Sequence, residues 1–193
     1  MKRAFTLIEA LVVVAVILFL AAILFPIFAR SRDNHKLSCM SPLKQIGLGV
    51  LQYVQDYDER LPPTRVGATV GWADLLQPYL KSTQIFQCPQ GQAGPTAFTT
   101  DYFYNRRLAR VTMDKLTGPA LTVLGGDGDD NAPTWNSWAQ LPADATTNSD
   151  SPCQRHLGMG NYLFADGHVK ALSPTSVSST LTSPTSRPTF AFR

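Results

Sequence analysis

A histidine, an aspartate and a second histidine near the carboxyl end are spaced closely enough for acid–base or metal chemistry. Nine residues separate His156 from the dipeptide Asp166-Gly167, and His168 follows directly. Imidazole and carboxylate groups are the usual general acids and bases. No nucleophile stands beside them, and side chains that flank a turn often hydrogen-bond to its backbone. We therefore favour a structural role, with an enzyme that uses His156 and Asp166 as the alternative of a different class.

An acidic run over residues 126–131 offers oxygen ligands at alternate positions. Asp127, Asp129 and Asn131 supply them, in a pattern that would suit calcium. The run lacks the closing glutamate of an EF-hand loop. We therefore expect a solvated acidic turn and no cofactor or metal, with calcium as the weaker alternative.

The three cysteines, Cys39, Cys88 and Cys153, are too far apart in sequence for a zinc-knuckle pattern. If the domain is exported, one disulfide with one thiol left over is the simplest arrangement. Cys39 is expected near the start of a helical segment and Cys88 in a loop that packs over it, so this pair is the first candidate. Cys153 is an equal rival partner, since three cysteines allow three different single bridges.

The N-terminal segment is apolar enough to span a bilayer. Residues 5–29 contain a single charge, Glu9, and follow the basic pair Lys2 and Arg3. About 20 apolar residues cover the ~30 Å hydrocarbon core as a helix. The basic flank is expected to stay in the cytoplasm, which places the rest of the chain outside.

Glu9 distinguishes this segment from a plain membrane anchor. An acidic residue inside a membrane helix costs roughly 2.5–3.5 kcal/mol on insertion scales, so its presence indicates a partner or a function. A cleavable secretory signal would end in small residues, whereas this run continues through Phe25, Pro26, Ile27 and Phe28. Neither a signal peptide nor a simple anchor explains the carboxylate.

The stretch from Lys2 to Glu9 (KRAFTLIE), with the apolar run after it, resembles the processing signal of type IV prepilins and type II secretion pseudopilins. The resemblance implies cleavage by prepilin peptidase between Ala4 and Phe5, followed by N-methylation of Phe5. Ala4 departs from the family, which usually has glycine there. In the family, Glu9 would meet the Phe5 amine of a neighbouring subunit during assembly, where each charge offsets the other. Pro26 also resembles the family, although an ordinary helix-ending proline explains it equally well.

An amphipathic helix is expected over residues 30–57. Apolar residues there recur at spacings of three and four and form one stripe that docks the head: Leu43, Ile46, Val50, Val54 and Tyr57. A helix continuous over residues 5–57 would be about 80 Å long. The alternative is a break near residues 39–42, because Ser41-Pro42 is typical of a helix start.

The remaining elements predict an α+β fold. A loop at residues 58–63 precedes a short helix or turn-rich segment at 72–80. Short apolar or aromatic runs bounded by Gly, Pro or Asn predict four strands, at residues 98–104, 120–125, 161–165 and 168–172. Asp166-Gly167 predicts a two-residue hairpin turn between the last two, because glycine tolerates the positive φ of such a turn. The resemblance to pilins implies that the long N-terminal helix packs on this small antiparallel sheet.

The spacing of His156, Asp166 and Gly167 resembles the H-X9-DG domain of pilin-like proteins that carry the same N-terminal signal. Residues 43–47 (LKQIG), 72–81 and Cys88-Pro89 are also similar to that group, so the resemblance covers most of residues 2–172. The chain departs from it at Pro42, where asparagine is usual. The resemblance implies no catalytic role for the histidine or the aspartate.

The tail, residues 173–193, is rich in Ser, Thr and Pro and too poor in apolar residues to fold alone. Flexibility, O-glycosylation, and a strand completed by a partner through Phe190 and Phe192 all remain open for it.

The charge balance excludes nucleic-acid binding by the folded domain. The chain has 17 basic and 14 acidic residues. Removal of Lys2 and Arg3 leaves 15 minus 14, or +1. A phosphate-binding surface needs clustered Lys and Arg.

The sequence thus predicts a leader at residues 1–4, a transmembrane assembly helix at 5–29, an extracytoplasmic head at 30–172, and the tail. The implied function is that of a non-enzymatic subunit of a type IV pilus-like filament, a helical homopolymer. The alternatives are a minor pseudopilin of a type II secretion system and a membrane-anchored enzyme. Expected partners are prepilin peptidase, the inner-membrane assembly platform and further copies of the chain. The precursor would be a single-pass inner-membrane protein, and the product a cell-surface filament (fimbrium) or a periplasmic pseudopilus.

Overall fold

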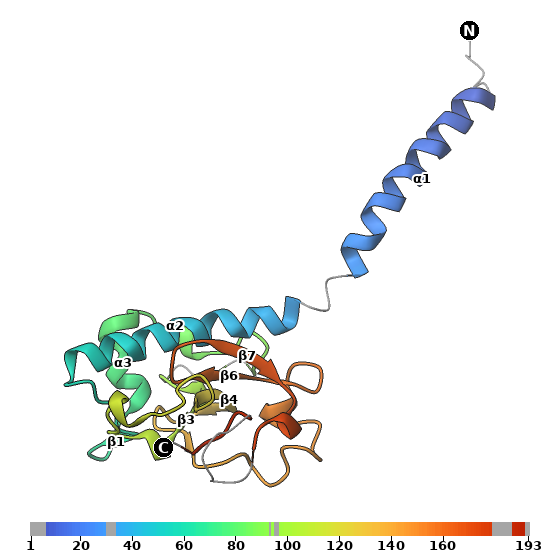
Figure 1. Cartoon of the computed structure of the whole chain (residues 1–193). Coiled ribbons are helices and arrows are strands. Elements are labelled where there is room, and N and C mark those ends of the chain that lie inside the picture. Colours follow the sequence, from blue (N-terminus) through green and yellow to red (C-terminus); the bar gives the residue numbers. More distant parts are fainter. Residues whose placement is uncertain (1–6, 30–33, 93, 95–96, 179–186, 192–193) are drawn as a thin grey trace. The chain divides into compact units, whose positions relative to one another are not determined.

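The computed structural model describes residues 7–29, 34–92, 94, 97–178 and 187–191, and within residues 23–39 only the course of the backbone. The chain divides into two compact units, Met1–His35 and Lys36–Arg193. We call the second unit the head, and each unit is described by itself. Helix α1 belongs to the first unit, and the central sheet belongs to the head (Figure 1).

Helix α1, Leu7–Ala29, is apolar at every position except Glu9, and it continues past Pro26. All side chains from residue 7 to residue 22 are exposed within this unit. Exposed apolar surface of this extent indicates contact with lipid or with protein. Among the helices that the structure describes, none combines the length and the hydropathy that a membrane crossing requires.

Helix α2, Asn34–Asp56, places one apolar stripe on the head. Its buried members, each at most 6% exposed, are Leu43, Ile46, Val50 and Val54. The spacing of these residues predicts this burial. The fifth predicted member is wrong: Tyr57 lies beyond the end of the helix, is 52% exposed, and stacks on the ring of Tyr53.

The alternative of a break near residues 39–42 does not hold, because α2 runs through this region with Pro42 inside it. A proline removes one backbone donor from a helix. The burial of the adjacent stripe compensates for this loss. The predicted continuity of the helix over residues 5–57 falls partly on residues 30–33, which lie outside the described residues.

Five strands form the central sheet of the head, in the order β5-β3-β4-β6-β7 (Figure 1). Neighbouring strands are antiparallel, except that β3 and β5 run parallel. The strands are β3 Thr100–Asn105, β4 Val123–Ala132, β5 Ser137–Trp138, β6 Gly160–Phe164 and β7 Val169–Leu172. Each of the four predicted strands overlaps one of these, so the α+β class is confirmed.

Shorter elements surround the sheet. Helix α3, Trp72–Leu80, has the predicted bounds. It follows a small hairpin of β1, Arg65–Val66, and β2, Val70–Gly71. The Gly71 N–H donates a 2.7 Å hydrogen bond to Asp74 Oδ2, which satisfies a backbone donor at the helix start. The 3-10 turns are η2 Gln84–Phe86, η3 Arg106–Leu108, η4 Met113–Lys115, η5 Pro152–Gln154 and η6 Pro174–Ser176.

Both faces of the sheet are covered by other parts of the head. Tyr102, Tyr104 and Leu163 belong to one core, which they share with α2 and α3. Phe103 and Tyr162 alternate with them along the same strands and belong to a second core. Since neither face meets solvent, all 6 residues of β3 are buried.

The tail closes the second core. Phe190 is 1% exposed, and its ring stacks on that of Phe103 with centroids 5.6 Å apart. The Val123 N–H donates a 2.9 Å hydrogen bond to the Thr189 carbonyl. The end of the tail is therefore part of the head, because Phe190 fills the face of the sheet that α2 leaves open. Phe192 lies outside the described residues.

The hairpin between β6 and β7 contains Asp166-Gly167, as predicted. The Phe164 N–H donates to the His168 carbonyl over 2.9 Å, so the link is three residues, 165–167, rather than the predicted two. Gly167 has a φ of +84°. A three-residue link typically ends in this left-handed conformation, which glycine adopts without strain.

This hairpin docks on α2. Lys44 Nζ donates a 2.7 Å hydrogen bond to the Gly167 carbonyl. A Cβ atom at Gly167 would lie 2.9 Å from the Leu51 side chain. The LKQIG segment and the DG turn, which stand apart in the sequence, therefore form one contact between helix and sheet.

The acidic run forms part of the central strand β4 and not the solvated turn that the sequence predicts. Glycines within the run allow the neighbouring strands to approach closely. A Cβ atom at Gly126 would lie 2.6 Å from the Asn161 carbonyl oxygen and 3.0 Å from the Phe103 ring. Because both faces of this strand are sealed, the carboxylates of the run cannot all reach water.

Substitution Gly126→Ala is expected to lower the free energy of unfolding by about 3 kcal/mol, because the added methyl group would collide with backbone on β6. The matched control is Gly158→Ala, where φ is +79° and the methyl group meets nothing within 4 Å. This control carries only the left-handed backbone strain of about 1–2 kcal/mol. Denaturant unfolding of the two variants measures the difference, and equal losses would contradict the packing argument.

Candidate functional site

The predicted processing site lies at the edge of the described structure. Ala4 and Phe5 fall outside the described residues. Glu9 lies in the first turn of α1 and is exposed. Its neighbours along the helix are all apolar. The carboxylate therefore belongs to a surface that lipid or protein has to cover.

A second candidate site lies inside the head, where His156 meets Asp127. His156 Nε2 lies 3.1 Å from Asp127 Oδ2, and both side chains are 1% exposed. Asp127 Oδ2 also accepts a 2.7 Å hydrogen bond from the Asn161 N–H on β6. The sequence grouped His156 with Asp166, and Asp127 with a calcium run. The structure instead joins the two motifs to each other.

The segment that carries His156 is fixed to β4. Arg155 Nη2 donates a 2.9 Å hydrogen bond to the Gly128 carbonyl, and it also pairs with Asp130 Oδ1. The His156 N–H donates to the Met159 carbonyl over 2.9 Å, which turns the chain back toward β6. The fold therefore holds the imidazole against the strand.

Several polar atoms around this pair have no hydrogen-bond partner among the described residues. His156 Nε2 and Asp127 Oδ2 are close but lack hydrogen-bond alignment. The other such atoms are His156 Nδ1, Asp127 Oδ1, the Tyr102 hydroxyl, and the side-chain oxygen and nitrogen of Asn161. A buried polar group without a partner costs about 1–3 kcal/mol. The cluster is therefore suited to a polar or charged ligand.

Asp101 on β3 is a second buried carboxylate, and the sequence analysis missed it. Its Oδ2 accepts a 2.7 Å hydrogen bond from the Cys88 N–H, and its Oδ1 accepts a 2.8 Å bond from the Asn131 N–H. Burial raises the pKa of Asp101, while these two hydrogen bonds oppose the rise. The available signal was a lone aspartate inside the predicted strand at residues 98–104.

Both carboxylates act on Tyr102. Burial raises the pKa of its hydroxyl far above the ordinary value, and the charges of Asp127 and Asp101 raise it further, against the opposite effect of Arg155. The hydroxyl therefore stays neutral at physiological pH. Two carboxylates against one guanidinium leave an excess of negative charge at this place.

The cysteines have different states. Cys88 is disulfide-bonded, whereas Cys153 is free and buried. Burial raises the pKa of the Cys153 thiol. Cys88 and Cys153 are therefore not paired with each other, and the Cys39 side chain lies outside the described residues. The Cys88 sulfur, an Asp127 oxygen and a His156 nitrogen all lie within 4.8 Å of one another.

Asp166 and His168 form a separate pair at the surface of the hairpin. Asp166 Oδ1 lies 2.6 Å from His168 Nδ1 and accepts a 3.1 Å hydrogen bond from the His168 backbone N–H. The His168 ring stacks on Phe164 with centroids 4.2 Å apart. Asp166 thus partners His168 in the turn while His156 is buried against Asp127, so the two residues of the enzyme alternative are not brought together.

The predicted calcium ligands are also not gathered. Asp127 is buried, while Asp129 is exposed. Asn131 Nδ2 donates a 3.3 Å hydrogen bond to the Gln92 carbonyl. In the strand that these residues form, their side chains do not share one environment.

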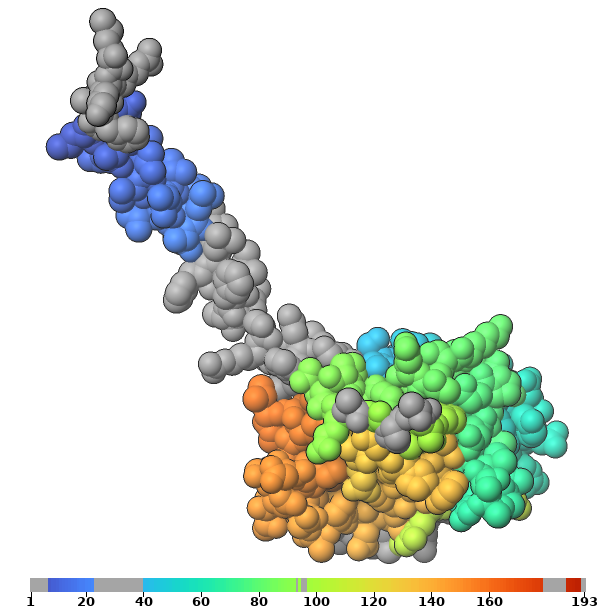
Figure 2. Space-filling view, turned by 180° about the vertical axis from the view of Figure 1, so that it is seen from behind, coloured from blue at the N-terminus to red at the C-terminus, as the bar shows by residue number. Residues whose placement is uncertain are grey.

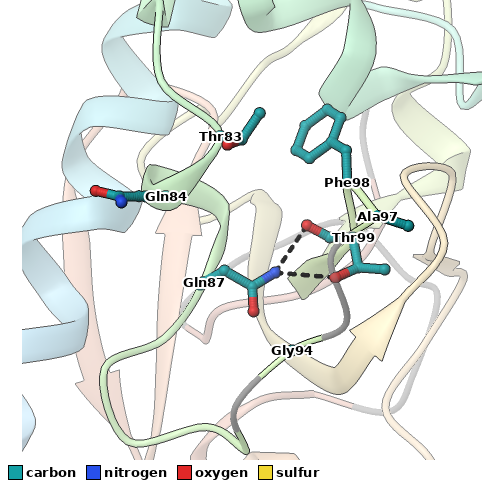
Figure 3. Close-up of a pocket in the computed structure, with 7 residues that line it drawn as sticks. All are labelled: Thr83, Gln84, Gln87, Gly94, Ala97, Phe98 and Thr99. Atoms are coloured by element: carbon teal, nitrogen blue, oxygen red, sulfur yellow. Dashed lines mark hydrogen bonds between the residues drawn. The ribbon is translucent and has the colours of Figure 1, made fainter.

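A surface pocket of about 470 Å³ offers binding space but little chemistry (Figure 3). Its lining residues are Thr83, Gln84, Gln87, Gly94, Ala97, Phe98 and Thr99. Gln87 Nε2 donates to the Thr99 carbonyl over 2.9 Å and to its Oγ1 over 3.1 Å. In the space-filling view, the green segment that carries this pocket borders the yellow and orange segments of the head (Figure 2). None of the lining side chains is charged, so the pocket supports no acid–base chemistry.

Comparison with known proteins gives one finding, at the amino terminus. Residues 1–25 match the family model of the prokaryotic N-terminal methylation motif. No curated protein and no solved structure matches the chain. The match ends before the head, so it does not reach the H-X9-DG segment. Residues 1–25 therefore carry the processing signal that type IV prepilins and pseudopilins have at the amino terminus, which is the signal that prepilin peptidase recognises.

Proposed function

We propose that the chain is a structural subunit of a type IV pilus-like filament, assembled from many copies through helix α1. The observation that carries this proposal is the methylation motif at residues 1–25 on a helix whose described side chains are all exposed. Before assembly the same helix would hold the precursor in the inner membrane. The assembly platform there would then pass the processed subunit into the filament.

The apolar surface of α1 supports assembly through this helix. Its exposed large side chains include Leu11, Ile17 and Phe19. In water such a surface associates with other apolar surface. In lipid, helices of this kind associate by close packing and by polar contacts between neighbours. A filament core made of α1 helices would cover the apolar surface of each helix by both kinds of contact.

Glu9 provides the polar contact. Cleavage between Ala4 and Phe5 would create a positively charged amine close to Glu9 along the helix. A charge at the centre of an apolar environment costs several kcal/mol by itself. An ammonium group and a carboxylate that meet there offset this cost for each other, which favours the stacking of one processed subunit on the next.

The head supports a structural role. The imidazole of His156 is 1% exposed, and the pocket beside Gln87 has no charged lining residue. The exposed Asp166–His168 pair is occupied with the backbone of its own turn. These features favour a structural role for the described part of the head.

Glu9→Gln is expected to leave membrane insertion intact and to reduce filament yield at least about tenfold. The reason is that an amine buried without its carboxylate costs more than about 1.4 kcal/mol at each contact between subunits, which corresponds to a factor of ten. Glu59→Gln is the matched control, since Glu59 is exposed on the head. Sheared filaments are quantified against membrane-bound subunit for both variants. Equal yields from the two variants would refute the role of Glu9.

Mass spectrometry of the assembled product is expected to find a chain that begins at Phe5 with a methylated amine. Cleavage there removes the basic residues Lys2 and Arg3, which a buried helix end would not tolerate. Ala4→Gly should be processed at least as fast as the natural sequence, because it restores the residue usual in the family. A mature chain that retains Met1, or that begins beyond residue 22, would rule out the proposed processing.

A further inference from the structure

We propose that Cys88, Asp127 and His156 form a transition-metal site that becomes available when the Cys88 disulfide is reduced. Their ligand atoms lie within 4.8 Å of one another, and all three residues are buried. They come from three separate parts of the head: the loop after η2, strand β4 and the segment after η5. Thiolate, carboxylate and imidazole are the ligands that zinc and similar divalent ions take in proteins.

The distance between the side chains of His156 and Asp127 is close to that between two ligands of one metal ion. His156 Nε2 and Asp127 Oδ2 lie 3.1 Å apart without hydrogen-bond alignment. In a tetrahedral zinc site with bonds of about 2.0–2.1 Å, nitrogen and oxygen ligands lie about 3.3 Å apart. Because the imidazole nitrogen and the carboxylate oxygen lie this close without a hydrogen bond between them, both can bind the same metal ion.

The surrounding groups hold these ligands in place. The Asn161 N–H fixes Asp127 Oδ2 at 2.7 Å. Asp101 Oδ2 accepts the Cys88 N–H at 2.7 Å, and the Gly91 N–H donates to the Cys88 carbonyl at 2.8 Å. The Cys88 backbone therefore has anchors other than its disulfide, so its sulfur can stay near the site after reduction. Outer hydrogen bonds of this kind typically orient metal ligands.

The charge of the cluster favours a cation. Asp101 and Asp127 both act on Tyr102, against the single guanidinium of Arg155. A divalent ion bound by one thiolate, one carboxylate and a neutral imidazole is a neutral unit, which is the form that burial favours. The unpartnered Tyr102 hydroxyl and the unpartnered Asn161 side chain are candidates for a fourth ligand.

The redox state of Cys88 decides whether the site exists. In the disulfide-bonded state the sulfur has no thiolate charge to give to a metal. A dithiol reductant supplies two electrons and two protons, the sulfur–sulfur bond breaks, and two thiols form. Metal binding then releases the Cys88 thiol proton. Oxidation reverses these steps and expels the ion, so the disulfide and the metal exclude each other.

Cobalt(II) titration of the full chain in detergent tests this proposal. The reduced chain is expected to bind cobalt with a thiolate-to-cobalt charge-transfer band and the visible bands of a tetrahedral ion. The oxidised chain is expected to show neither. His156→Gln and Asp127→Asn should each weaken cobalt binding about tenfold or more. The control variants Asp166→Asn and His168→Gln change the other aspartate–histidine pair, which lies at the surface of the hairpin. They should leave cobalt binding unchanged.

The double variant Cys39→Ser/Cys153→Ala makes the test independent of reductant, because Cys88 is then the only cysteine and its thiol is free. Cobalt binding by this variant, or folding of it that depends on added zinc, supports the site. A folded variant that binds no cobalt overturns the proposal. A thiolate-to-cobalt band that persists in the His156→Gln chain also overturns the proposal. Cobalt binding by the oxidised chain does so as well. The same holds if the double cysteine variant stays unfolded with zinc present.

Discussion

The covered central strand β4 is the constraint on which the rest of the head depends. Its neighbours approach so closely that a Cβ atom at Gly126 would lie 2.6 Å from a carbonyl oxygen of β6. In the buried part of this strand, the carboxylate of Asp127 has no access to water, and a buried charge needs partners within the protein. Asp127 accepts a hydrogen bond from the backbone N–H of Asn161, and the imidazole of His156 lies 3.1 Å away. The segment that follows η5 therefore has to fold back onto β4.

Asp101, on the neighbouring strand β3, is likewise a buried carboxylate with partners within the protein. Its carboxylate holds both the Cys88 loop and the Asn131 backbone of β4. Asp101 thus fixes the loop after η2 and the far end of β4, and Asp127 on the adjacent strand binds the backbone of β6. Arg155 joins the His156 segment to Gly128. The polar interior determines which connecting segments meet, whereas the apolar stripes determine how helices lie on the sheet. A metal ion at Cys88, Asp127 and His156 would use positions that this network already holds.

The sequence predicted the features that depend on local spacing and missed those that depend on distant partners. The stripe on α2, the bounds of α3 and the Asp-Gly hairpin follow from periodicity or from the conformation of glycine, which are properties of a few neighbouring residues. The pairing of His156 with Asp127 and the role of Asp101 depend on which strands become neighbours. The burial of Phe190 likewise follows from a sheet face that only the folded head leaves open. The spacing of His156 and Asp166 suggested a pair, but a hairpin residue is satisfied by its own turn.

The two units of the chain place a carboxylate in apolar surroundings in different ways. In the head, the fold itself supplies the groups around Asp127. On α1, all described side chains are exposed, so Glu9 belongs to a surface that lipid or neighbouring molecules can cover. The charge count then explains why processing would have to precede assembly. Before cleavage, Lys2, Arg3 and the terminal amine oppose a single carboxylate within the first residues. After the proposed cleavage, one amine at Phe5 would oppose one carboxylate at Glu9, and such a balanced pair would be compatible with burial between helices.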